Sequence, residues 1–226
     1  MALPTELALS IETITGKLVN PSNPDPTSID VHDIAWALSR IPRFAGHSIT
    51  EIPYNVAQHC IYVSELLERA IYSTVDETDE LFPIVSDEKV VTELVAARDT
   101  DAKTCFSLML KALLHDAHEA YIGDVPSPVK RIPSLTKTFK DLEDKLDTAI
   151  FSHFGLDVPT LTDKSIIKYF DKLAQAIEGY QFMPSRGLHW NLPKPPLTLI
   201  QEFPEPQRPI DSYKAFLKRF EYLHGQ

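Results

Sequence analysis

Residues 108–126 read LMLKALLHDAHEAYIGDVP, and this stretch decides most of what the chain can be. It opens with an almost wholly apolar run, which is typical of a buried helix. That run ends on His115 and Asp116, two adjacent side chains that can bind a metal. Burying such groups is costly unless a metal or another partner compensates. Because the carboxylates Glu119 and Asp124 follow, the stretch predicts a functional site at the end of this helix.

Two distant segments offer further metal ligands. His59 lies at or beside the apolar face of a helical pattern over residues 54–67, and Asp171 lies near the apolar stripe of residues 166–178. With His115 and Asp116 they would form a site of two imidazoles and two carboxylates. That set suits Mn, Fe, Co, Ni, Zn or Mg rather than a thiolate-seeking ion. In an octahedral site it would leave positions open for water or a phosphate oxygen.

The order His59, His115-Asp116, Asp171 resembles the H…HD…D signature of the HD-domain phosphohydrolase superfamily. The similarity is greatest to its small 5′-deoxynucleotidase-like branch and that branch's phage and bacterial relatives. These share patterns close to RFAGH at residues 43–47, YNVAQH at 54–59 and LHDAHEAYIGDVP at 114–126. The resemblance covers residues 13–190 and implies one divalent metal ion held by the four ligands. The chain departs from the branch at His118, where a small or apolar residue is expected, and at residues 72–100, which look like an insertion.

The resemblance also implies roles in catalysis and in substrate binding. Glu119 would orient or deprotonate water, and Asp124 would assist it. Arg43 and His47 would contact phosphate, since a guanidinium grips phosphate through two parallel hydrogen bonds. His118 is either a packing residue or a group that faces the substrate.

The carboxylate chosen as the fourth ligand has two rivals on its own helix. Asp163 precedes Asp171, and Glu178 follows it by seven residues, which places Glu178 on the same helix face two turns later. Glu178 is therefore either a rival ligand or a group that orients a ligand from behind. Phe44 or Tyr121 could stack on a base, although both also fit a plain core.

Composition narrows the class of protein. The chain has 226 residues, of which 43% are hydrophobic and 24% charged, so we expect one globular domain over residues 1–226 with its core at about 28–183. The net charge of −10 argues against a nucleic-acid partner, whereas a metal and local cations can still hold a small anion. We expect buried free thiols at Cys60 and Cys105. Without an apolar run of membrane-spanning length or a signal peptide, we expect a cytoplasmic protein with no membrane partner, and a homodimer is compatible with the sequence.

Almost every element that the sequence predicts is helical. The fold class is therefore all-α, an HD-domain-like helical bundle with a Pro-rich C-terminal extension at residues 184–209. A short hairpin arm around Gly16 precedes the bundle, and Ser28 or Asp30 caps the first helix. An irregular acidic loop is expected at residues 75–90 and another loop at residues 123–133. The first expected helix ends near Leu38. The other expected helices span residues 54–74, 88–99, 101–117, 134–154, 162–182 and 210–224.

The leading functional hypothesis is a metal-dependent phosphohydrolase that cleaves a 5′-(deoxy)nucleoside monophosphate to nucleoside and phosphate. A dNTP triphosphohydrolase on the same scaffold is the alternative within the enzyme class. A non-catalytic, metal-bound nucleotide sensor is the alternative outside it. A cyclic-dinucleotide phosphodiesterase is disfavoured, because the HHExxDGxGYP continuation of that branch is absent after His115-Asp116.

Overall fold

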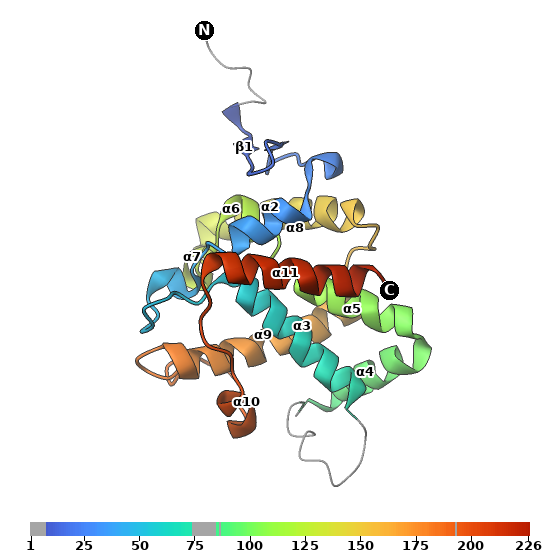
Figure 1. Ribbon diagram of the computed structural model, residues 1–226, viewed down its shortest axis with the longest axis vertical. Helices are drawn as coiled ribbons and strands as arrows, with labels where there is room; N and C mark the ends of the chain where they lie inside the picture. The colour runs from blue at the N-terminus through green and yellow to red at the C-terminus, as the bar shows by residue number, and fades with distance from the viewer. Residues whose placement is uncertain (1–7, 74–84, 86, 193) are drawn as a thin grey trace.

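The computed structural model describes residues 8–73, 85, 87–192 and 194–226, and helices make up most of this part of the chain (Figure 1). The expected all-α class is confirmed. The only strands among the described residues are β1 (Ile11–Glu12) and β2 (Leu18–Val19), which pair as the antiparallel arm expected around Gly16. The helices are η1 (Pro26–Ser28), α2 (Val31–Leu38), η2 (Arg43–Gly46), α3 (Val56–Tyr72), α4 (Glu88–Thr100), α5 (Ala102–Leu113), α6 (Glu119–Ile122), α7 (Ser127–Lys130), α8 (Pro133–His153), α9 (Leu161–Phe182), α10 (Leu197–Gln201) and α11 (Pro209–His224).

Side-chain caps fix where the main helices begin. Asp30 accepts a hydrogen bond from the backbone of α2, Asn55 from that of α3, and Asp101 from that of α5. Thr160 and Asp163 form a reciprocal capping box at the start of α9. Each such cap is worth about 1 kcal/mol. The caps therefore set the register of the three helices that carry or precede the expected ligands.

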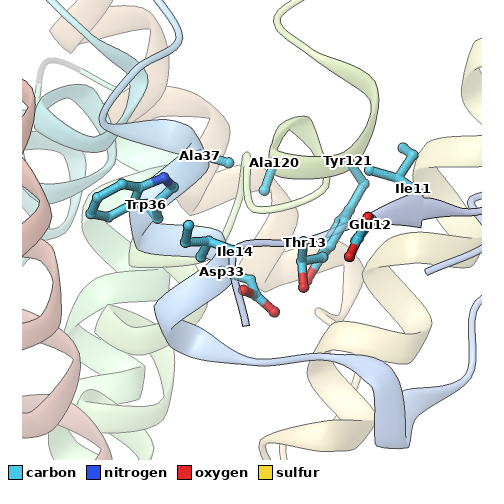
Figure 2. A pocket seen from close by; sticks show the side chains of 9 residues that line it. All are labelled: Ile11, Glu12, Thr13, Ile14, Asp33, Trp36, Ala37, Ala120 and Tyr121. Carbon is cyan, nitrogen blue, oxygen red and sulfur yellow. The ribbon is translucent and has the colours of Figure 1, made fainter. Parts of the chain in front are cut away.

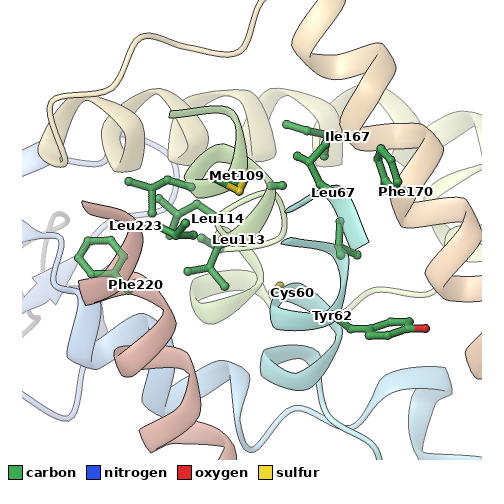
Figure 3. Packing of buried hydrophobic residues seen from close by; sticks show 14 of the residues in the cluster. Cys60, Tyr62, Leu67, Met109, Leu113, Leu114, Ile167, Phe170, Phe220 and Leu223 are labelled. Atoms are coloured by element: carbon green, nitrogen blue, oxygen red, sulfur yellow. The ribbon is translucent and has the colours of Figure 1, made fainter. Parts of the chain in front are cut away.

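The core is built around α3. This helix packs against α5 and α9, and α11 lies across α2, α3 and α5 (Figure 1). Figure 3 shows the apolar side chains that fill the space between them, among them Leu67 of α3, Met109 and Leu113 of α5, and Ile167 and Phe170 of α9. Because His59, Asp171 and the end of α5 belong to these same three elements, the packing that closes the core also brings the expected ligands together.

The segment that resembled an insertion contributes to the core in its second half. Helix α4 packs against α3, α5 and α9, and it buries Val90 and Leu94. Residues 74–84 and 86 lie outside the described residues, and so does most of the acidic loop expected at 75–90.

Three segments differ from the sequence prediction. Helix α5 ends at Leu113, whereas a helix through residue 117 was expected. The imidazole Nδ1 of His115 bonds to the carbonyl of Ala112 at 2.8 Å, and a continuing helix would offer that carbonyl to a backbone amide. The expected loop at 123–133 contains the one-turn helix α7, and the Pro-rich tail contains the short helix α10.

The N-terminal arm is fastened to α2 and lies beside a hollow. Asp33 accepts hydrogen bonds from the backbone and the hydroxyl of Thr15, at 2.9 and 2.8 Å. A cavity of about 420 Å³ lies between the arm, α2 and α6, and Trp36 and Tyr121 form two of its walls (Figure 2). Among the described residues that line it, none is an expected metal ligand.

In the part of the chain that the structure describes, no helix combines the length and the apolar composition that crossing a bilayer requires.

The packing of α9 predicts a large difference between two apolar side chains on the same helix. Phe170 is fully buried, whereas Leu161 is 88% exposed. Phe170→Ala is therefore expected to lower the free energy of unfolding by about 3–5 kcal/mol, because it leaves a cavity at the centre of the core. Leu161→Ala should change it by less than about 0.5 kcal/mol. Urea unfolding of both variants measures this, and similar losses in the two would contradict the packing described.

Candidate metal centre

The four expected ligands meet at one place. His59 comes from α3, Asp171 from α9, and His115 and Asp116 from the turn after α5. The Nε2 atom of His59 lies 3.4 Å from Oδ1 of Asp171 and 3.7 Å from Oδ2 of Asp116. The same Asp116 oxygen lies 3.2 Å from Nε2 of His115. Ligand atoms of His59, His115 and Asp171 all lie within 4.8 Å of one another, which is a spacing that one ion can bridge.

Both imidazoles turn the same nitrogen toward this centre. Nδ1 of His115 donates to the carbonyl of Ala112, and Nδ1 of His59 lies 2.6 Å from Oε1 of Glu178. Since a carbonyl or carboxylate oxygen accepts, each ring donates from Nδ1, and in its neutral form it offers the lone pair of Nε2 to the centre. Both Nε2 atoms are buried and have no hydrogen-bond partner among the described residues. Buried polar atoms are nearly always satisfied, so this pair of orphaned acceptors fits the divalent metal that the resemblance implies.

Glu178 is held as a charged group in the interior. It is fully buried, and its second oxygen accepts a hydrogen bond of 3.0 Å from Nε of Arg43. Burial alone would raise the pKa of this carboxyl, but Arg43 and His59 outweigh it and hold the pKa below the ordinary value. The structure thus places Glu178 behind His59, which corresponds to the orienting alternative of the sequence analysis. Asp163, the other alternative to Asp171 as a ligand, lies elsewhere. It accepts a hydrogen bond of 2.9 Å from Lys111 and belongs to the capping box of α9.

The two aspartates of the centre are ionised. Burial opposes the charge of Asp116, but His115 and His59 outweigh it and hold the pKa well below its usual range. Burial likewise opposes the charge of Asp171, but the adjacent imidazoles of His59 and His115 outweigh it and lower its pKa. Both carboxylates can therefore act as anionic ligands.

Glu119 has the opposite character. It opens α6 and is only 4% exposed, and its Oε2 atom has no hydrogen-bond partner among the described residues. Burial raises its pKa well above the usual value, and the charges of Asp116 and Asp124 add to that effect. Asp124 is half-buried, and burial is also the main cause of its raised pKa. A carboxyl that readily holds a proton beside ionised ligands is the arrangement that general acid–base chemistry uses.

The residues expected to touch phosphate are separated by the structure. Arg43 is buried beside the centre, and its NH1 atom lies 3.8 Å from Oδ2 of Asp116 while Nε serves Glu178. His47 is exposed at the end of η2, and no hydrogen bond or ion pair of its side chain to the cluster is seen among the described residues.

His118 is a buried residue tied to α8. Its Nδ1 atom lies 2.9 Å from Oδ1 of Asp147, and its Nε2 atom lies 3.9 Å from Oε1 of Glu143. Burial lowers the pKa of the imidazole, but Asp147 outweighs that effect and raises it. Lys130 joins the same group, since its Nζ atom lies 2.7 Å from Glu143 and 3.8 Å from Glu119.

Sequence reasoning did not find Glu143, Asp147 or the role of Lys130. The available signal was the spacing of the two acids, four residues apart on either side of the buried Leu146. That spacing places both on one helix face near the apolar stripe, yet nothing local in the sequence says which partner they meet.

Cys60 touches the centre without fitting it as a ligand. Both cysteines are buried free thiols, as expected, and Cys60 lies close to His115 and Asp116. Burial raises the pKa of the Cys60 thiol to about 11, so the thiolate that a metal requires does not form readily.

Comparisons with known proteins bear on the family that the chain resembles. Residues 89–181 match the model of the YfbR-like family, described as 5′-deoxynucleotidase YfbR-like. An uncharacterised protein of Escherichia coli, YfdR, is 28% identical over 215 residues, which cover 94% of each chain. An uncharacterised protein of Rhodobacter capsulatus is 28% identical over 169 residues, which cover 74% of this chain and 70% of the relative. The resemblance to HD-domain phosphohydrolases of the 5′-deoxynucleotidase-like branch is thereby confirmed.

The geometry predicts that Asp116→Ala abolishes divalent-metal binding, because this carboxylate adjoins both imidazoles at the centre. Titration calorimetry with Mn²⁺ measures the loss. Asp144→Ala is the matched control, since that exposed aspartate pairs with Lys140 on the surface of α8 and the variant should keep its affinity for the ion. Undiminished Mn²⁺ binding by Asp116→Ala would show that the ion is held elsewhere.

A second prediction concerns the group behind the ligand. Glu178→Gln removes the charge that orients His59 and leaves the side chain's shape unchanged. Mn²⁺ affinity should fall by about 10- to 100-fold, the usual effect of losing a partner that orients a ligand. Equal affinity in Glu178→Gln and the natural chain would refute the orienting role.

Proposed function

We propose that this protein is a metal-dependent phosphohydrolase that acts on nucleotides, most simply on a 5′-deoxynucleoside monophosphate to give nucleoside and phosphate. The observation that carries the proposal is the pair of buried, unpartnered Nε2 atoms facing Asp116 and Asp171, with the protonatable Glu119 beside them. The family match supports the reaction class, since its description is that of a 5′-deoxynucleotidase.

In the proposed reaction, His59, His115, Asp116 and Asp171 hold the divalent ion. When bound, such an ion neutralises charge on the phosphoryl oxygens and makes an adjacent water easier to deprotonate. The chain's contribution is to keep both imidazoles in the one tautomer that can bind it, through Glu178 and the carbonyl of Ala112. The residues arrive already oriented, so little rearrangement opposes binding.

Glu119 is the proposed acid–base group. Its buried carboxyl is close enough to Asp116 and Asp124 for their charges to raise its pKa, which suits a group that takes a proton from water and later returns one. Lys130 lies 3.8 Å from its Oε1 atom and stabilises the ionised form. Asp124 shares this neighbourhood and is proposed to assist Glu119.

Charge around the centre favours a substrate with one phosphate. Among the described residues, the cations that form ion pairs with the carboxylates of the centre and its neighbours are Arg43 and Lys130. Their charges are therefore already partly neutralised by the protein. A triphosphate would place more negative charge beside Glu119, Asp124 and Glu143. Since like charges in a partly buried site repel strongly, the monophosphate fits better.

The acid–base role predicts that Glu119→Gln keeps the metal and loses at least about 100-fold in turnover, the usual scale for general acid–base assistance. Metal content by mass spectrometry and phosphate release from a deoxynucleoside monophosphate measure the two quantities. Glu202→Gln, at an exposed glutamate on the surface pair with Arg69, is the control and should retain full activity. Loss of metal from Glu119→Gln would instead make Glu119 a ligand.

The substrate assignment is tested by incubating the protein and Mn²⁺ separately with each deoxynucleoside mono- and triphosphate. Orthophosphate and triphosphate are then assayed individually. Orthophosphate from the monophosphates is expected. Triphosphate release alone would replace this proposal with a dNTP triphosphohydrolase, and metal binding without any release would indicate a nucleotide sensor.

A further inference from the structure

The loop that supplies Arg43 has an unfavourable backbone. Phe44 and Ala45 both lie in the left-handed region, with φ of 58° and 52°, and Gly46 follows with φ of 78°. For residues with a Cβ atom this conformation costs about 1–2 kcal/mol each. Hydrogen bonds hold the loop at its two sides, from the amide of Arg43 to Tyr54 and from the amide of Ile49 to Phe182. A third bond, from the amide of His47 to the carbonyl of Phe44 at 3.0 Å, closes the turn on itself but does not tie it to α9.

An aromatic side chain from the Pro-rich extension packs on this loop. Trp190 stacks on Phe44, with ring centroids 5.6 Å apart and planes inclined by 30°. The indole also lies against Gly179 of α9. A Cβ atom at residue 179 would lie 2.4 Å from Cζ3 and 2.9 Å from Cε3 of Trp190, so only glycine admits the ring at this distance. Trp190 thus contacts the strained loop and the backbone of α9 together.

The two residues that Trp190 contacts are chain neighbours of a buried ion pair. Phe44 follows Arg43, and Gly179 follows Glu178. Arg43 and Glu178 are joined by the 3.0 Å hydrogen bond, and the other oxygen of Glu178 holds Nδ1 of His59. The Arg43 guanidinium also lies 5.5 Å from the centroid of the Phe44 ring. If the loop moved away from α9, the hydrogen bond between Arg43 and Glu178 would lengthen. Glu178 would then lose the partner that holds it against His59.

We propose that Trp190 is a positioning residue for the metal centre. By bridging Phe44 and Gly179 it fixes the strained loop to α9, and thereby keeps Arg43 on Glu178 and Glu178 on His59. Trp190 touches neither the ligands nor the substrate in this proposal. The inference rests on the proposed function for the metal, and it assigns to the C-terminal extension a role in building the site.

The first test compares Mn²⁺ affinities by titration calorimetry. Trp190→Ala removes the ring and is expected to weaken binding about tenfold, the lower end of the range for partners that orient a ligand. Gly179→Ala keeps the ring but displaces it, and should weaken binding to a similar extent. Trp190→Phe keeps a stacked ring and should restore most of the affinity.

Trp36→Ala is the matched control for the loss of an indole. Trp36 belongs to α2, packs on Tyr213 and Arg40, and lines the cavity beside the N-terminal arm. Its replacement should leave Mn²⁺ affinity unchanged, whatever it does to stability. Equal losses in Trp36→Ala and Trp190→Ala, or no rescue by Trp190→Phe, would reduce Trp190 to a general packing residue and overturn the proposal.

A second test does not depend on metal or turnover. The chain has two tryptophans, so Trp36→Phe leaves Trp190 as the sole indole emitter. Releasing the ion pair with Arg43→Lys should then shift the emission of Trp190 to longer wavelength, because the loop loosens from the ring. An unchanged spectrum would refute the coupling. If the natural chain binds no Mn²⁺, the metal centre fails as proposed, and this spectrum alone decides the link between Trp190 and Arg43.

Discussion

The ion pair between Arg43 and Glu178 is the interaction on which the rest of the centre depends. Removing two charges from water costs several kcal/mol per ion, and the cost is recovered only when both find good partners. Here Glu178 uses both oxygens, one for Arg43 and one for His59. The pair joins the loop before α3 to α9, with α3 held between them through His59. The orientation of His59 and the position of the Arg43 guanidinium thus depend on one buried carboxylate.

The centre gathers more negative charge than its cations balance. Asp116 and Asp171 are ionised, while Glu119 and Asp124 have raised pKa values because burial and their neighbours oppose a further charge. Such an arrangement lowers the stability of the folded chain and favours the binding of a cation. Asp116 and Asp171 favour the ionised form, whereas Glu119 readily holds a proton. This difference in pKa suits the proposed ligands to one role and Glu119 to another, although all three are carboxyl groups. Position, more than residue type, decides which carboxylate does which task.

The periphery of the site is supplied by elements that carry no recognisable motif. Helix α8 contributes Glu143 and Asp147, which hold Lys130 and His118. The Pro-rich extension contributes Trp190, which stacks on the loop bearing Arg43. His118 departs from the pattern of the resembling branch, and its partner Asp147 explains how the chain accommodates an imidazole in a buried position. The contacts of His118 with Asp147 and of Trp190 with Phe44 join residues 29 and 146 positions apart.

The sequence by itself determined the helical class, the cap of α2 at Asp30 as one of two candidates, and the four ligand candidates, because periodicity, capping residues and the His-Asp pair are local patterns. It also placed Glu178 two turns after Asp171 on one helix face. Tertiary structure alone decided that α5 stops at Leu113, that Arg43 faces Glu178 rather than solvent, and that Trp190 rests on Gly179. Those outcomes depend on which distant surfaces meet when the core closes. No local pattern encodes that choice, since the partners' identities are fixed only by packing in three dimensions.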